Sequence, residues 1–237
     1  MTLRIAFDLD GTLADMEPAV EEISARLFPQ PPEQAQASAP ATQDQNGASE
    51  ELTPEEEQLE PPSVRMLTQR QQHAIWDEVR RTENFWESLG ETEPGIVSRI
   101  AEIAEERRWE VIFITTRPES GGDTTQRQSQ RWLAAHGFAL PSVFVASGSR
   151  GKIAAALSLD IVVDDRTENC LDVKLDSPAR SILVARDAIP QTAANAKRLG
   201  IDAVPSVGAL LDELTATPPA KPSLLGRLKT MIGAGRR

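Results

Sequence analysis

Cysteine and tyrosine are almost missing from this chain. Its 237 residues include one cysteine, Cys170, and no tyrosine. A single cysteine excludes an intramolecular disulfide, and without a second cysteine beside it Cys170 is expected to be a small, buried apolar residue. The lack of disulfides favours a reducing compartment, and we expect a cytoplasmic protein.

Long apolar runs and an excess of positive charge are also missing. No apolar stretch approaches the roughly 20 residues that a helix needs to span a bilayer, and the run at the N-terminus is too short for a signal peptide. Lys and Arg number 25 against 36 Asp and Glu, a net charge of −11. Such a chain repels the backbone of nucleic acids, so we expect neither nucleic-acid binding nor a membrane span. The net negative charge still allows a local basic site that binds a small phosphorylated ligand.

Two segments have the composition of unfolded chain. Residues 29–62 are rich in Pro, Gln, Ala, Ser and Glu and contain no aromatic residue. They cannot bury enough apolar surface to offset the entropy lost on ordering, which predicts a disordered insert. Residues 218–237 form a Pro-containing tail with five basic and no acidic residues.

The rest of the chain alternates between short apolar strands and amphipathic helices. The predicted strands are 3–7, 111–114, 143–146, 161–163 and 181–184. The predicted helices are 16–28, 63–81, one beginning near 92–94, 124–136, 152–157, 190–199 and 205–214. Continuous apolar strands between helices are typical of a parallel sheet covered on both faces, so the predicted fold class is α/β.

Polar residues gather where these strands end. In such a sheet, ligands bind outside the carboxyl ends of the strands. The residues expected at that edge are Asp8 and Asp10, Thr115 and Thr116, Lys152, and Asp164 and Asp165. This edge therefore combines four carboxylates, two hydroxyls and one ammonium group.

That set of groups suits phosphoryl transfer. Asp8 and Asp10 lie two apart on an extended segment, so their carboxylates point the same way and repel unless a cation joins them or one of them holds a proton. Mg²⁺ prefers oxygen ligands and could be held by Asp8 with Asp164 and Asp165. Asp8 could then attack phosphorus, while Asp10 protonates the leaving oxygen and later activates water. Thr115 and Lys152 would hold the phosphoryl oxygens.

These residues resemble the motifs of the haloacid-dehalogenase-like (HAD) superfamily of phosphatases. Asp8-Leu-Asp-Gly-Thr12 matches the DxDGT pattern, and Thr115, Lys152 and the pair Asp164-Asp165 follow in the order of the other three motifs. The resemblance implies a Rossmannoid core, Asp8 as nucleophile, Asp10 as general acid and base, and Mg²⁺ as cofactor. It also implies that Asp164, Asp165 and the backbone carbonyl of Asp10 bind the metal. Asp at position 10 favours phosphate chemistry over dehalogenation.

A finer resemblance concerns the segment between the first two motifs. Ala74-Ile-Trp76, the segment from Glu83 to Gly95 and Ile161-Val-Val-Asp-Asp-Arg166 are similar to 5′(3′)-deoxyribonucleotidases. Those proteins carry a small helical cap, which here implies a core of residues 1–15 and 91–217, a cap of residues 16–90, and a nucleoside monophosphate as substrate. The rings of Trp76, Phe85 and Trp86 would stack on the base.

Several alternatives stay open at this point. Lys152 could be a solvated surface lysine, with Lys174 as a rival, and Asp164-Asp165 could cap a helix. Thr116 and Arg117 could bind phosphate or be polar loop residues, and the three aromatic residues could pack the cap against the core. The substrate could be another small metabolite such as a phosphosugar, and the fold could serve binding or regulation without turnover.

Overall fold

The computed structural model describes residues 2–29, 61–186 and 195–216. Its main element is a six-stranded sheet in the order β5-β4-β1-β6-β7-β8, in which every neighbouring pair is parallel. The strands are β1 (Arg4–Asp8), β4 (Glu110–Thr115), β5 (Ser142–Val145), β6 (Ile161–Asp164), β7 (Arg180–Val184) and β8 (Asp202–Val204). The predicted parallel α/β fold is confirmed.

Helices cover both faces of the sheet because strand side chains alternate between the faces. Ile5 and Phe7 of β1 belong to one apolar cluster, and Ala6 belongs to another. The first cluster is completed by α5 (Ile96–Arg107), α6 (Thr125–Ala135) and α10 (Val207–Ala216). The second is completed by α7 (Arg150–Ala156) and α8 (Thr167–Asp176).

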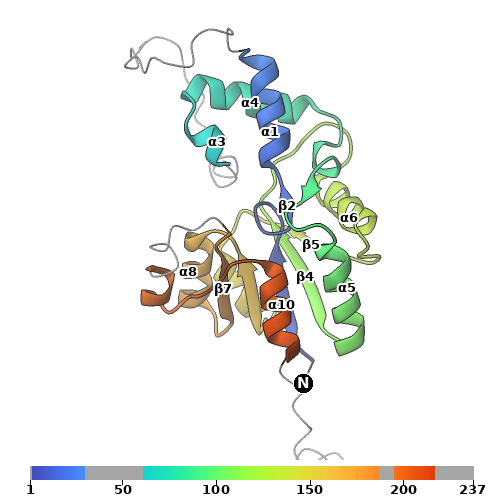
Figure 1. Ribbon diagram of the computed structural model, residues 1–237, viewed down its shortest axis with the longest axis vertical. Coiled ribbons are helices and arrows are strands. Elements are labelled where there is room, and N and C mark those ends of the chain that lie inside the picture. The colour runs from blue at the N-terminus through green and yellow to red at the C-terminus, as the bar shows by residue number, and fades with distance from the viewer. Residues whose placement is uncertain (1, 30–60, 187–194, 217–237) are drawn as a thin grey trace, which may run out of the picture.

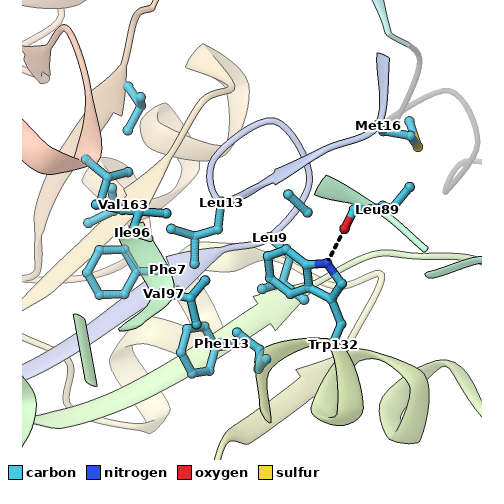
Figure 2. Packing of buried hydrophobic residues seen from close by; sticks show 14 of the residues in the cluster. Phe7, Leu9, Leu13, Met16, Leu89, Ile96, Val97, Phe113, Trp132 and Val163 are labelled. Atoms are coloured by element: carbon cyan, nitrogen blue, oxygen red, sulfur yellow. Dashed lines mark hydrogen bonds between the residues drawn. The ribbon is translucent and has the colours of Figure 1, made fainter. Parts of the chain in front are cut away.

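The larger apolar cluster packs the sheet against helices α5 and α6. Figure 2 shows Phe7 and Phe113 of the sheet beside Val97 of α5, with Leu9 and Trp132 next to them. The indole Nε1 of Trp132 donates a hydrogen bond to the carbonyl oxygen of Leu89 at 2.7 Å. The buried ring is thus satisfied at its polar end, as a buried tryptophan requires.

Three helices lie together beyond one end of the sheet and form the helical cap (Figure 1). They are α1 (Glu17–Leu27), α3 (Pro62–Arg65) and α4 (Gln69–Arg81). The chain leaves the core through β2 (Ala14–Asp15) and returns through β3 (Gly90–Glu91), and these two strands pair antiparallel. The cap is therefore an insertion after the first strand, as predicted.

The boundaries of several predicted elements differ from the structure. The helix expected over 63–81 is two helices, because the hydroxyl of Thr68 accepts from the N–H of Gln71 in a capping box that starts α4 afresh. Helix α8 and strand β8 were not predicted. Most of the predicted insert at 29–62, part of the helix at 190–199 and the basic tail at 218–237 lie outside the described residues. None of the helices in the described ranges has the length and apolar character that a bilayer span requires.

Candidate active site

The nucleophile candidate lies at the end of the central strand. Asp8 is the last residue of β1, which is paired with β4 on one side and β6 on the other. Strands β4 and β6 end at Thr115 and Asp164, so the topology brings the three sequence motifs to one edge. Asp8 and Asp10 are each 7% exposed and Asp164 is 1% exposed. The site is a cluster of desolvated carboxylates.

Gly11 turns the chain within the first motif, after β1, and leaves room for Asp165 of the fourth. Its φ is +83°, a conformation that residues with a side chain rarely adopt. A Cβ at this position would stand 2.2 Å from Oδ2 of Asp165. The hydroxyl of Thr12 donates to Oδ1 of the same carboxylate at 3.4 Å. The first motif therefore lies directly against Asp165, as the metal hypothesis requires.

Asp164 is held by the start of α8. Its Oδ1 accepts from the backbone N–H of Arg166 at 2.9 Å, and both of its oxygens accept from Nδ2 of Asn169, at 3.1 and 3.0 Å. The alternative that Asp164 acts as a helix-capping residue is thus partly realised. Asn169 was not among the predicted site residues, because helix α8 itself was not predicted.

The cation beside Asp8 is Arg150, whereas Lys152 had been predicted. Nη2 of Arg150 donates to Oδ1 of Asp8 at 2.6 Å, and its Nε lies 3.6 Å from Oδ2 of Asp164. Arg150 is 3% exposed. Lys152 is exposed on α7, and no ion pair joins it to a carboxylate of the site among the described contacts. Of the two interpretations of Lys152, its exposure favours a solvated surface lysine over a ligand of the phosphoryl oxygens.

The start of α7 explains why Arg150 reaches the site. Ser149 caps the helix by accepting from the N–H of Lys152 at 3.1 Å, so α7 begins at Arg150, two residues earlier than predicted. A Cβ on Gly151 would lie 2.3 Å from the carbonyl oxygen of Asp172, so only glycine lets α7 pack this closely on α8. Ser149 was the available signal, because serine is a preferred N-cap residue.

Burial and mutual repulsion weaken the acidity of three of these carboxyls. Burial, and then the charge of Asp164, raise the pKa of Asp8 well above its ordinary value, although Arg150 opposes the shift. Burial also raises the pKa of Asp164. The pKa of Asp165 is raised from 3.8 to about 7, again by burial and then by the charge of Asp164. The cations of the protein do not fully compensate this negative charge.

The donor set suits a divalent cation. Carboxylate oxygens are the ligands that Mg²⁺ prefers, and the uncompensated charge favours an additional cation. In the described residues, however, no three carboxylate, histidine or cysteine side chains stand close enough together to hold one ion. The guanidinium of Arg150 contacts both Asp8 and Asp164. Charge and donor chemistry therefore fit Mg²⁺, and ligation requires these side chains to move.

Thr115 and Arg117 are directed at Asp10. Nε of Arg117 lies 2.9 and 2.8 Å from the two carboxylate oxygens of Asp10, and the hydroxyl of Thr115 donates to Oδ2 at 3.2 Å. Arg117 is 2% exposed and Thr115 is fully buried. The guanidinium of Arg117 is therefore paired with Asp10, and Thr115 contacts the same carboxylate, whereas substrate-binding and phosphoryl-binding roles had been predicted for them.

A large cavity opens beside this edge of the sheet. It has a volume of about 720 Å³ and is lined by residues 116–120, 122–126 and 145–147 and by Arg80 from α4. Thr116 is one of its lining residues, so its predicted contact with substrate stays open. The other lining groups include the hydroxyls of Ser120, Thr124 and Ser147. Among the described residues around the cavity, none is aromatic.

The three predicted base-stacking residues are buried elsewhere. Trp76 and Trp86 have no exposed surface, and Phe85 is 3% exposed. Phe85 and Trp86, in the short helix η1 (Phe85–Glu87), form an edge-to-face pair with centroids 5.0 Å apart. In this arrangement no ring offers a face to a nucleobase, and the packing alternative is the one that the structure supports.

Solved structures share this architecture. A candidate β-phosphoglucomutase from Thermotoga maritima matches with a TM-score of 0.52 and 20% identity, over 92% of this chain and 100% of that one. A haloacid dehalogenase-like hydrolase from Streptococcus pneumoniae matches with a TM-score of 0.52 and 13% identity, over 91% and 99%. The chain has the HAD-like Rossmannoid fold. A hydrolase from Pseudomonas syringae matches with a TM-score of 0.51 and 14% identity, over 91% and 99%. No family model and no curated protein matches the sequence.

Proposed function

We propose that this HAD-like protein hydrolyses phosphomonoesters through an aspartyl-phosphate on Asp8. The observation that carries the proposal is the contact of Arg150 with both Asp8 and Asp164, with Asp10 two residues beyond Asp8. A nucleophilic carboxylate, a cation for the phosphoryl oxygens and a second acid are the groups that such a reaction needs.

The reaction would proceed in two displacements. A carboxylate oxygen of Asp8 attacks phosphorus, the bond from phosphorus to the ester oxygen breaks, and that oxygen takes a proton from Asp10. Water then attacks the phosphorus of the aspartyl-phosphate and gives its proton to Asp10, which releases inorganic phosphate and restores Asp8. Each displacement conserves charge and protons within the site.

Arg150 is suited to hold the phosphoryl group. Its Nη1 is buried and has no hydrogen-bond partner among the described residues. A buried unpaired donor is costly, so a ligand oxygen that accepts from it is favoured. Asp8, Asp164, Asp165 and the backbone carbonyl of Asp10 would hold Mg²⁺, which when bound would neutralise charge on the phosphoryl oxygens.

The experiment is phosphate release from p-nitrophenyl phosphate in the presence of Mg²⁺ or EDTA. We expect turnover with Mg²⁺ that EDTA abolishes. Asp8→Asn should be inactive and Asp202→Asn, on the exposed part of β8, should equal the wild type. Hydroxylamine should trap the acyl-phosphate in the wild-type protein only. Turnover by Asp8→Asn near the wild-type rate would rule out this mechanism and leave a different nucleophile to be found.

For the substrate, the deoxyribonucleotidase resemblance supports a nucleoside 5′-monophosphate. One observation favours a second candidate, a sugar or polyol phosphate. The cavity that Thr116 helps to line includes the hydroxyl-bearing residues Ser120, Thr124 and Ser147 and, among the described residues, no aromatic ring. Base–aromatic stacking is typically worth about 1–3 kcal/mol, which this cavity cannot supply, whereas hydroxyl groups pair well with a polyhydroxylated leaving group.

A panel of nucleoside monophosphates and sugar phosphates distinguishes the candidates. If the cavity takes a polyol, sugar phosphates should have the higher kcat/KM. Thr116→Val, which removes one lining hydroxyl at constant shape, should raise KM for the preferred sugar phosphate and leave acetyl phosphate unchanged, because its leaving group is too small to extend into the cavity. Preference for nucleotides in this panel would favour the first candidate.

A further inference from the structure

Arg117 occupies a closed compartment between two tryptophans. Its guanidinium carbon lies 4.9 Å from the ring centroid of Trp86 and 5.8 Å from that of Trp132. Its side chain has no exposed surface. Both distances fall within the range of cation–π contacts, which are strongest when the partners are desolvated. The two rings therefore stabilise a buried positive charge.

Both indole rings are themselves held by hydrogen bonds. Nε1 of Trp86 donates to the carbonyl of Pro118 at 3.0 Å, and Nε1 of Trp132 donates to the carbonyl of Leu89 at 2.7 Å. On its outer side, Nη1 of Arg117 donates to the hydroxyl of Ser129 at 3.0 Å. Nη2 has no hydrogen-bond partner among the described residues, so Nε, Nη1 and the two rings hold the guanidinium in place.

The guanidinium of Arg117 occupies acceptor positions on the carboxylate of Asp10. A carboxylate has about four acceptor positions. The Nε–H of Arg117 is shared between both oxygens, and Thr115 takes a further position on Oδ2. The backbone N–H of Arg117 donates to the hydroxyl oxygen of Thr115 at 3.3 Å, which directs the hydroxyl hydrogen toward Asp10. One acceptor position remains, on Oδ1.

We infer that Arg117 is the positioning residue of the general acid and base: it fixes the carboxylate of Asp10 so that the remaining position on Oδ1 faces the leaving oxygen. The inference rests on the proposed function. The last torsion of an aspartate is broad, so Asp10 alone would sample many orientations. Trp86 and Trp132 contribute to turnover through Arg117, without contacting the substrate.

The leaving group distinguishes this role from a purely structural one. An alkoxide departs poorly unless it is protonated, whereas p-nitrophenolate departs without a proton. A misplaced acid therefore slows alkyl phosphates selectively. The measurement is kcat/KM, which reports steps up to the first irreversible one, for glycerol 3-phosphate and p-nitrophenyl phosphate in parallel.

Four variants make the comparison. For Arg117→Met we expect kcat/KM for glycerol 3-phosphate to fall by about 10²-fold, the lower end of what general acids contribute, while p-nitrophenyl phosphate changes by no more than about 3-fold. Arg117→Lys keeps the charge but loses the planar guanidinium, so its kcat/KM for glycerol 3-phosphate should lie between those of the wild type and Arg117→Met. Ser129→Ala, which removes one hydrogen bond, should shift the ratio in the same direction by less, even if Arg117→Met does not fold. Arg180→Met, an exposed arginine of β7, is the control for a lost charge.

The outcomes separate this inference from the proposed function. Equal losses for both esters in Arg117→Met, Arg117→Lys and Ser129→Ala would overturn the positioning role and leave a structural one. Unchanged kcat/KM for both esters in all three variants would overturn it as well. A wild-type protein that releases phosphate from neither ester would overturn the proposed function, and the inference with it.

Discussion

Replacing Arg150 with methionine should destabilise this protein strongly in the absence of metal. The guanidinium is 3% exposed and contacts Oδ1 of Asp8 at 2.6 Å and Oδ2 of Asp164 at 3.6 Å. Its removal leaves two buried carboxylates without their common cation. Removing one partner of a buried ion pair typically costs about 3–5 kcal/mol, because the remaining charge stays desolvated and unpaired.

The expected change in melting temperature follows from the size of the chain. Each kcal/mol shifts the melting temperature by roughly 2–4 °C in proteins of 150–250 residues, so Arg150→Met should melt about 6–20 °C below the wild type. The assay is thermal unfolding followed by circular dichroism in EDTA at pH 7.5. Lys152→Met is the matched control: it removes a positive charge two residues away, and exposed substitutions of this kind stay within about 0.5 kcal/mol.

Divalent cations should repair part of the damage. A cation that pairs with Asp8 and Asp164 would replace the missing charge, so Mg²⁺ or Ca²⁺ should raise the melting temperature of Arg150→Met more than that of the wild type. A small effect of Arg150→Met together with a large effect of Lys152→Met would refute this reasoning and restore the original sequence prediction.

Three further predictions concern the same site. Asp10→Asn should lower turnover of alkyl phosphates by about 10²–10⁴-fold while circular dichroism shows an intact fold, since an amide cannot transfer the proton; near-normal turnover would contradict the assignment. The raised pKa of Asp165, from 3.8 to about 7, means that the folded state binds more protons than the unfolded state over this range. Its contribution to stability is therefore present at acid pH and lost as the pH rises toward 7, and in EDTA the melting temperature of Asp165→Asn relative to wild type should increase over this interval. Trp86→Ala should cost about 3–5 kcal/mol and slow nucleotide and sugar substrates alike, because the ring packs in the interior; a KM effect confined to nucleotides would revive base stacking.

The sequence was sufficient to predict the fold class because the strands are short continuous apolar runs, whereas the helices between them carry apolar residues at helical spacing. The runs that lead to Asp8, Thr115 and Asp164, residues 5–7, 111–114 and 161–163, are apolar throughout, as strands buried on both faces are. Helix α8 escaped prediction because only Cys170 and Val173 of its residues are buried, which leaves hardly any helical period. The three residues of β8 are too few to show a pattern.

The errors in the site have a common physical origin. The sequence showed which polar residues follow each strand but not the direction of their side chains. Arg150 was missed because its role depends on where α7 begins, and helix boundaries are the least certain part of such a prediction. Arg117 was identified as a functional residue, but its burial between Trp86 and Trp132 depends on contacts between distant segments. No local pattern encodes such contacts.

The central position of β1 has a consequence for motion at the site. This strand is hydrogen-bonded along both edges, so its amides can exchange with solvent only when the sheet itself comes apart. Asp8 is thus attached to the part of the molecule that opens most rarely. Arg150 stands at the start of the short helix α7, where opening costs less. The site therefore combines a nucleophile that stays in place with a cation, Arg150, that can adjust around an arriving phosphoryl group.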